Sequence, residues 1–163
     1  MSRLDSAIRR LKAQKSALED AAERIAGVEG PLLEFGLGNG RTYDHLRKIL
    51  PGRRIVVFDR QVAAHPDCIP PDEDLYLGDL FETLPRAIQE VGPSAALAHL
   101  DIGTGDKVQS MALVARAAPL IAGLLTHGAV VVSDQPIEGV PGLSPLPLPS
   151  DIEPGRIHML VKA

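Results

Sequence analysis

The chain has 163 residues, of which 45% are hydrophobic and 23% are charged, as is typical of one soluble globular domain. Its single cysteine, Cys68, excludes an intrachain disulfide and fits a reducing compartment, so we expect a cytoplasmic protein. A net charge of -4 and 3% aromatic residues argue against nucleic acid as the main partner. No apolar run is long enough to span a membrane, so no membrane association is expected.

Residues 1–27 are predicted to form an amphipathic helix, with Ser2 and Asp5 as a capping box and Gly27 as its end. Apolar residues recur every seven positions along one stripe, at Leu4, Leu11, Leu18 and Ile25, with Ile8, Lys15 and Ala22 between them. Such a stripe packs either on its own domain or on another subunit. We therefore expect a homo-oligomer in which this helix is the candidate contact.

Residues 30–134 alternate short apolar runs with helical stretches. Strands are predicted at 32–35, 55–58, 75–77, 96–100 and 129–132, and helices at 41–50, 82–91 and 107–125, the last interrupted near Pro119. Continuous apolar strands separated by helices are typical of a parallel sheet covered on both faces. The pattern indicates one α/β domain with a doubly wound, mainly parallel sheet.

The final part of the chain has a different composition. Residues 135–155 are rich in proline, which excludes a long helix and confines any strand there to an edge of the sheet. Residues 156–163 are predicted to form the last strand. The only segments left outside the core 30–134 and this strand are the first helix and the proline-rich loop, which leaves little material for recognising a large substrate.

Residues that follow the predicted strands are the candidates for binding, because ligands of parallel sheets lie at the carboxyl ends of the strands. The first strand leads into Glu34-Phe-Gly-Leu-Gly-Asn-Gly40, whose glycines permit close approach of a ligand to the backbone. A dinucleotide fingerprint would have its third glycine at position 41, where this chain has Arg41, so an NAD-binding module is disfavoured. Asp59, Gly78-Asp79 and Asp101 follow the next three strands.

This ordered set resembles the class I S-adenosylmethionine-dependent methyltransferases. The resemblance implies their seven-stranded type of sheet with an antiparallel last strand, and S-adenosylmethionine as the cofactor. By the same comparison, the glycine-rich segment wraps the methionine part, Asp59 holds the ribose hydroxyls, and Asp79 and Leu80 bind the adenine. The cofactor-binding residues implied are Glu34, Phe35, Gly36, Leu37, Gly38, Asn39, Gly40, Thr42, Asp59, Arg60, Gly78, Asp79, Leu80 and Asp101.

The resemblance also places Asp101 beside the methyl-transfer centre, as the candidate catalytic residue. The favoured function is methyl transfer to a small-molecule acceptor. One alternative is a catechol-type O-methyltransferase, in which Asp101, Asp134 and Gln135 would bind magnesium. The chain lacks the Asn/Asp-Pro-Pro-aromatic motif of enzymes that methylate exocyclic amines of bases.

Two further expectations complete the prediction. His99 lies within an apolar strand, so we expect a buried, hydrogen-bonded residue and not a base. Outside catalysis, the chain could be a regulatory subunit that binds S-adenosylmethionine without using it.

Overall fold

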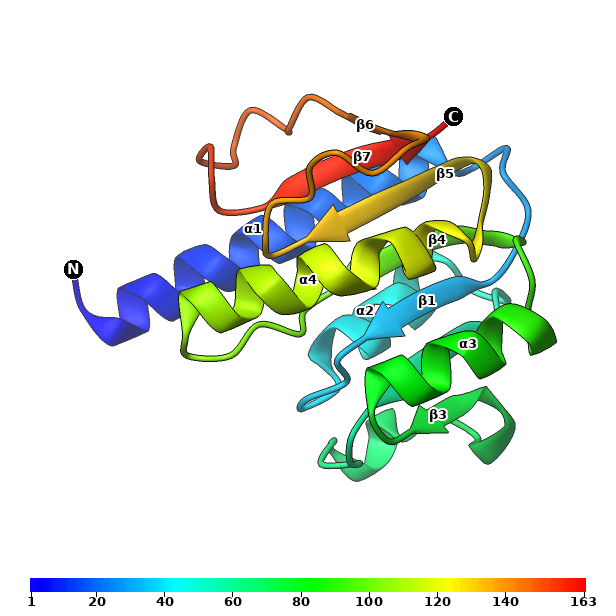
Figure 1. Ribbon diagram of the computed structural model, residues 1–163. Helices are drawn as coiled ribbons and strands as arrows, with labels where there is room; N and C mark the ends of the chain where they lie inside the picture. Colours follow the sequence, from blue (N-terminus) through cyan, green and yellow to red (C-terminus); the bar gives the residue numbers. More distant parts are fainter.

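The computed structural model describes residues 1–163, which form one seven-stranded sheet in the order β3-β2-β1-β4-β5-β7-β6 (Figure 1). The strands are β1 (Leu32–Phe35), β2 (Ile55–Asp59), β3 (Leu75–Leu77), β4 (Ala95–Leu100), β5 (Leu125–Ser133), β6 (Leu143–Pro145) and β7 (His158–Lys162). The first five strands run parallel, and β7 is antiparallel to both β5 and β6. The predicted doubly wound sheet with an antiparallel last strand is confirmed.

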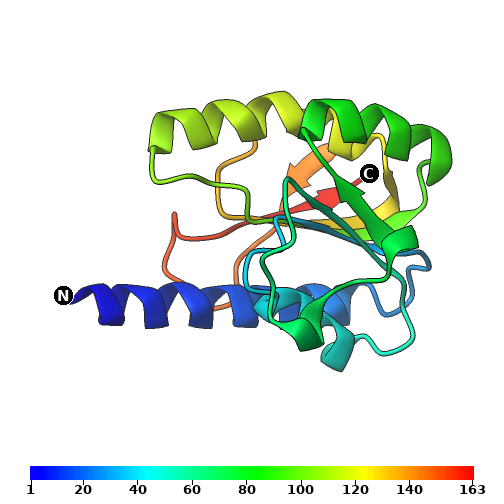
Figure 2. The same cartoon turned by 90° about the horizontal axis from the view of Figure 1, so that it is seen from below.

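Four helices cover the two faces of this sheet, as Figure 2 shows. Helices α1 (Arg3–Arg24) and α2 (Arg41–Ile49) lie on one face, and α3 (Leu80–Glu90) and α4 (Lys107–Ala122) lie on the other. Two short 3-10 turns, η1 (Pro66–Cys68) and η2 (Asp72–Asp74), connect β2 to β3. None of the helices combines the length and the apolar character needed to cross a lipid bilayer.

The core is aliphatic and divides into one cluster on each face of the sheet. Every residue of β1 and β4 is buried, as expected for parallel strands covered on both sides. One aromatic row crosses the sheet, because Phe35, Phe58 and Tyr76 stack on neighbouring strands with ring centroids 4.5 and 5.0 Å apart. Burying such continuous apolar surface is the main favourable term that holds the strand ends in place.

Helix α1 has the predicted capping box, but its apolar face differs from the predicted stripe. Ser2 Oγ accepts the Asp5 N–H at 3.0 Å, and the Asp5 carboxylate accepts the Ser2 N–H at 2.9 Å. Leu18 is fully buried on the sheet, whereas Leu4 is 69% exposed and Ile8 is 42% exposed. The prediction of a single apolar stripe that packs along the whole helix was wrong for two reasons. A strict seven-residue repeat drifts around a straight helix, and the first half of α1 extends beyond the carboxyl ends of the parallel strands (Figures 1 and 2).

Two boundaries late in the chain also differ from prediction, whereas a third feature, a short strand at the sheet edge, agrees with it. Helix α4 continues through Pro119 and ends at Ala122, because an interior proline removes one backbone hydrogen bond without necessarily breaking a well-packed helix. Strand β5 begins at Leu125 and not at 129, within the segment predicted as helix. The proline-rich loop carries one short strand, β6, which lies at the edge of the sheet. A proline is tolerated there because an edge strand does not need every backbone N–H for pairing.

Candidate active site

A cavity of about 600 Å³ opens where β1, β2, β3 and β4 end, and we call it the glycine cavity. Its volume lies within the usual range of small-molecule sites. The residues that line it are Gly36, Gly38, Phe58, Asp59, Arg60, Gly78, Asp79, Leu80, Phe81, Asp101, Ile102, Gly103, Thr104, Gln109 and Leu113. They come from the end of β2, from the loops after four parallel strands, and from the first turn of α3 and the first two turns of α4.

The loop after β1 is held by Asp59, the last residue of β2. One oxygen of its carboxylate accepts the backbone N–H groups of Leu37 and Gly38 at 2.8 and 3.3 Å. Gly36 has φ +92°, and a Cβ there would lie 2.3 Å from the Asp101 carbonyl oxygen, so only glycine lets the ends of β1 and β4 approach this closely. Gly38 has φ +52°, and a Cβ there would meet nothing within 4 Å. The loop is therefore a cradle with space above Gly38.

Asp79 lies at the opposite wall of the glycine cavity and caps α3. Its Oδ1 accepts the Phe81 N–H at 2.8 Å, and its other oxygen is 3.8 Å from Arg60 Nη2. A helix cap explains why an aspartate stands there, but the cap leaves the second oxygen on the side of Arg60. The residue therefore has a structural role and also lines the cavity.

Beneath the cradle, Glu34 and His99 form a fully buried pair. The two residues are register partners on β1 and β4, and His99 Nδ1 lies 2.5 Å from Glu34 Oε1. Thr42 Oγ1 donates to the other Glu34 oxygen at 2.9 Å. Burial lowers the pKa of His99, but the charge and hydrogen bond of Glu34, together with Asp101 and Asp134, raise it above its ordinary value of 6.5. The expected buried, bonded histidine is confirmed.

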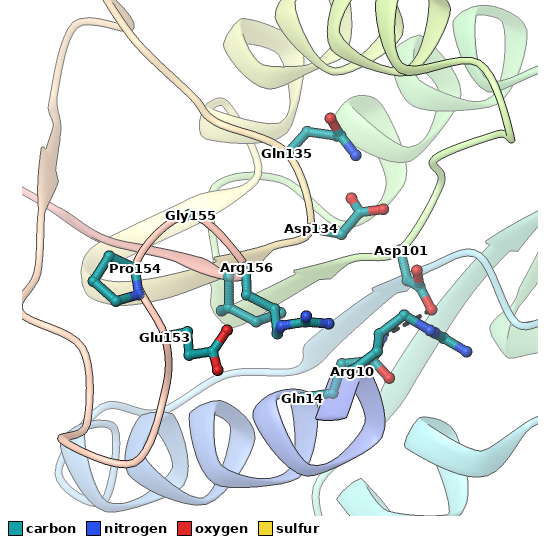
Figure 3. Close-up of a pocket in the computed structure, with 10 residues that line it drawn as sticks. Arg10, Gln14, Asp101, Asp134, Gln135, Glu153, Pro154, Gly155 and Arg156 are labelled. Carbon is teal, nitrogen blue, oxygen red and sulfur yellow. Dashed lines mark hydrogen bonds between the residues drawn. The ribbon is translucent and has the colours of Figure 1, made fainter. Parts of the chain in front are cut away.

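A second cavity of about 480 Å³ adjoins the first, and we call it the arginine cavity (Figure 3). It lies where β4 and β5 end, beside α1 and the loop that leads to β7. Its lining residues are Arg10, Gln14, Asp101, Asp134, Gln135, Glu153, Pro154, Gly155, Arg156 and Ile157. Asp101 lines both cavities, and Gln14 Nε2 on α1 donates to its Oδ2 at 3.0 Å. The two cavities therefore meet at Asp101.

Asp134 lies on the wall of the arginine cavity immediately after β5. Its Oδ1 is buried and has no hydrogen-bond partner. Burial and the neighbouring Asp101 raise the pKa of Asp134, and the nearby Gln135 side chain, His99 and Gly103 backbone oppose that rise without cancelling it. A Cβ at position 103 would lie 2.6 Å from Asp134 Oδ2, so Gly103 allows the carboxylate to pack this close to the loop after β4. A buried carboxylate with a free oxygen is suited to accept a proton.

The structure divides the predicted site residues into two groups. Those whose side chains or backbone line the glycine cavity are Gly36, Gly38, Asp59, Arg60, Gly78, Asp79, Leu80 and Asp101. The others lie under or beside the cradle, and they are Glu34, Phe35, Leu37, Asn39, Gly40 and Thr42. Asp134 and Gln135 are brought together with Asp101 in the arginine cavity.

Sequence reasoning missed seven of the ten residues that line the arginine cavity, among them Arg10, Gln14 and Arg156. Gln14 carried one usable signal, since a polar residue on the buried face of a helix needs a polar partner. Arg10 and Arg156 carried none, because the first is an exposed helix residue and the second precedes a strand at the other end of the chain.

Comparison with known proteins identifies the family. A family model described as S-adenosyl-L-methionine methyltransferase matches residues 1–162. The chain belongs to this family of methyltransferases. A crystal structure of an S-adenosyl-L-methionine methyl transferase from Silicibacter pomeroyi DSS-3 shares 42% of its sequence, with a TM-score of 0.94, over 100% of this chain and 99% of that one. No curated protein sequence matched this methyltransferase.

More distant structures show the fold alone. Human methyltransferase-like protein 13, in complex with SAH, has 13% identity and a TM-score of 0.59 over 94% of this methyltransferase and 80% of that chain. The antibiotic-resistance methyltransferase Kmr has 12% identity and a TM-score of 0.53 over 91% and 93% of the two chains. The resemblance inferred from the strand-end residues is thus confirmed at the level of fold and family.

S-adenosylmethionine is the cofactor of the methyltransferase, and the glycine cavity fits it. The space above Gly38 and the carboxylates of Asp59 and Asp79 provide a cradle and hydrogen-bond acceptors around it. Asp101, Asp134 and Gln135 lie together, yet no group of three His, Cys, Asp or Glu side chains is placed to hold a metal ion.

Proposed function

We propose that the methyltransferase binds S-adenosylmethionine in the glycine cavity and a small-molecule acceptor in the arginine cavity. The observation that carries this proposal is that Asp101 lines both cavities, so that cofactor and acceptor would meet there. The arginine cavity, at about 480 Å³, has a volume suited to a small molecule. All the cofactor-binding residues expected from the sequence are part of the proposal, either as lining or as support of the cradle.

Two carboxylates have separate roles in the proposed reaction. S-adenosylmethionine, when bound, supplies a methyl group already activated on a sulfonium sulfur. Asp101, held by Gln14, orients the acceptor at the junction of the cavities. Asp134, which lines the arginine cavity, takes the proton from the acceptor hydroxyl or amine, which leaves the nucleophilic lone pair free to form the new bond. Orientation and exclusion of water supply much of the rate enhancement in such transfers.

The glutamate beneath the cradle acts as a positioning residue in this proposal. Glu34 is fully buried and is bonded to His99 and Thr42, so it fixes the end of β1 against β4 and the start of α2. These contacts hold the cradle and Asp101 in a constant relative position. Direct contact of Glu34 with the cofactor stays a prediction.

We also propose a cytoplasmic, homo-oligomeric protein. The free, buried Cys68 supports a reducing compartment. The exposed Leu4 and Ile8 on the part of α1 that extends beyond the sheet support a contact with a second copy.

Calorimetry tests the cofactor part of the proposal. S-adenosylmethionine and S-adenosylhomocysteine should each bind with a micromolar Kd, and NAD should not bind. Tight binding of NAD with neither of the other two would overturn the proposal.

Methylation assays test the acceptor part. Incubation with methyl-labelled cofactor should transfer label to a metabolite fraction and not to protein or nucleic acid. Added chelator should leave the rate unchanged, whereas loss of activity with rescue by magnesium would favour the metal-dependent alternative. Cofactor binding with no labelled product in a broad metabolite screen would favour the regulatory subunit.

A further inference from the structure

We propose that the acceptor carries a carboxylate or phosphate group, which Arg10 and Arg156 bind in the arginine cavity. This inference rests on the proposed function, because it names the substrate class of the cavity next to the cofactor. Neither arginine belongs to the residues implied by the family resemblance.

Arg10 and Arg156 have no ionic partner of their own. Most other arginines pair with a carboxylate, such as Arg9 with Glu153 and Arg54 with Asp74, whereas neither Arg10 nor Arg156 makes an ion pair or a side-chain hydrogen bond. Figure 3 shows both side chains extending into the same space, one from α1 and the other from the loop before β7. Two unpaired guanidinium groups that converge in a cavity present planar forks of donors, which match the oxygens of carboxylates and phosphates.

The three carboxylates of the cavity do not neutralise this pair. Glu153 is engaged by Arg9, and Asp101 Oδ2 accepts the amide of Gln14. Asp134 makes no ion pair with either arginine, and its Oδ1 is buried without a hydrogen-bond partner. The cavity therefore has a cationic side for an oxyanion and a carboxylate side for a hydroxyl or amine that donates a hydrogen bond. An acceptor with both groups would bind with its nucleophile at Asp101 and Asp134.

The two arginines are also held on elements that are tied together. Ser16 Oγ on α1 donates to Asp151 Oδ1 at 2.8 Å, and Arg9 on the same helix pairs with Glu153. Ile152 and Ile157, on either side of the turn, are buried in the core. The loop that carries Arg156 is therefore fixed against the helix that carries Arg10. Such fixed placement lowers the entropy lost when an anion binds.

The test measures anion binding directly, by following the arginine Nε–H resonances in NMR spectra. Inorganic phosphate and malonate are titrated separately into protein saturated with S-adenosylhomocysteine, which keeps them out of the glycine cavity. The variants are Arg10→Gln and Arg156→Gln. The control is Lys12→Gln, which removes one positive charge from the exposed side of the same helix. Calorimetry measures the affinity of every variant for S-adenosylhomocysteine.

The expected result is that at least one of the two anions shifts the Arg10 and Arg156 resonances. Each arginine substitution should then weaken the binding of that anion at least about fivefold, as for loss of a charge-assisted hydrogen bond. Lys12→Gln should leave the binding of the anion unchanged. Preference for phosphate or for malonate identifies the group on the acceptor. S-adenosylhomocysteine should bind all variants equally well.

Two results would overturn the inference. One is the absence of anion binding that depends on Arg10 and Arg156. The other is a loss of S-adenosylhomocysteine affinity in the arginine variants as large as their loss of anion affinity. The arginines would then hold the carboxylate of the cofactor and not the acceptor. Failure of the proposed function is a separate outcome, because it would be seen as failure of the unmodified protein to bind S-adenosylhomocysteine at all. In that case the same anion titrations, made without S-adenosylhomocysteine, still decide the inference.

Discussion

His99 Nδ1 lies 2.5 Å from Glu34 Oε1 in the centre of the sheet, and both side chains are shielded from solvent. The raised pKa of His99 means that the protonated ring favours the folded state. Its contribution to stability is fully present below the ordinary pKa of 6.5 and is lost as the pH rises through the higher value in the folded protein. The pair therefore links the stability of the cofactor cradle to pH.

We expect Glu34→Gln to lower the free energy of unfolding at pH 6 by about 3–5 kcal/mol, because it leaves a buried charge without its partner. It should also flatten the fall in stability above pH 6.5. Urea unfolding across this pH range measures both effects. The control is Glu90→Gln, because Glu90 accepts a hydrogen bond from Tyr76 but is 55% exposed, so its loss should cost within about 1 kcal/mol. An unchanged pH profile in Glu34→Gln would contradict the role of the pair.

Asp59 should contribute to cofactor affinity through its charge and through the cradle. We expect Asp59→Ala to weaken the binding of S-adenosylhomocysteine by about 1–3 kcal/mol, the usual value of a charged hydrogen bond. Calorimetry measures the change, and Asp72→Ala is the control, because Asp72 is exposed and lies outside both cavities. Equal affinities in the two variants would count against the ribose-binding role of Asp59.

Gly38 and Gly52 form a matched pair for testing the cradle. Both have positive φ and open space around the missing Cβ, but only Gly38 lines the glycine cavity. Each change to alanine should cost about 1–2 kcal/mol of stability, because L-residues disfavour this conformation. Only Gly38→Ala should weaken S-adenosylhomocysteine binding, by about 1–3 kcal/mol, as is usual for overpacking. If Gly52→Ala has the same effect on binding, the cradle is not at Gly38.

Asp134→Asn should separate stability from activity. A raised pKa means that the ionised carboxylate disfavours the folded state above that pKa, and that this cost disappears as the pH falls. The neutral variant should therefore have a higher urea midpoint at pH 8 than the unmodified protein, with a smaller gain at pH 4. Methyl transfer should fall by about 100-fold or more, as for loss of a general base. A variant with full activity would contradict proton transfer to Asp134.

The exposed end of α1 allows a test of oligomerisation. If Leu4 and Ile8 contact a second copy, the double change Leu4→Glu and Ile8→Glu should convert the oligomer to a monomer, because it places charges in an apolar contact. Light scattering at micromolar concentration measures the mass. Val62→Glu changes an exposed apolar residue elsewhere and should leave the mass unaltered. An unmodified protein that is monomeric at this concentration would refute the prediction.

The sequence by itself determined the parallel sheet and the carboxylates at the ends of its strands. These features depend on local patterns, since each buried strand is a short apolar run and each carboxylate follows its strand directly. Asp59, Asp79 and Asp101 were predicted for this reason, and the structure brings them to one cavity. The seven-residue repeat on α1 predicted the wrong buried face. Periodicity does not tell how far a helix extends beyond the sheet that it covers.

Only the tertiary structure decided the arginine cavity, in which we propose that the acceptor binds. Arg10 and Arg156 lie near opposite ends of the chain and meet because α1 packs beside the loop before β7, a contact that no local pattern encodes. The same holds for Glu34 and His99, whose pairing depends on the register of β1 against β4. Long-range packing buries Glu34 and His99 against each other, and it places Arg10 and Arg156 without ionic partners on the wall of one cavity.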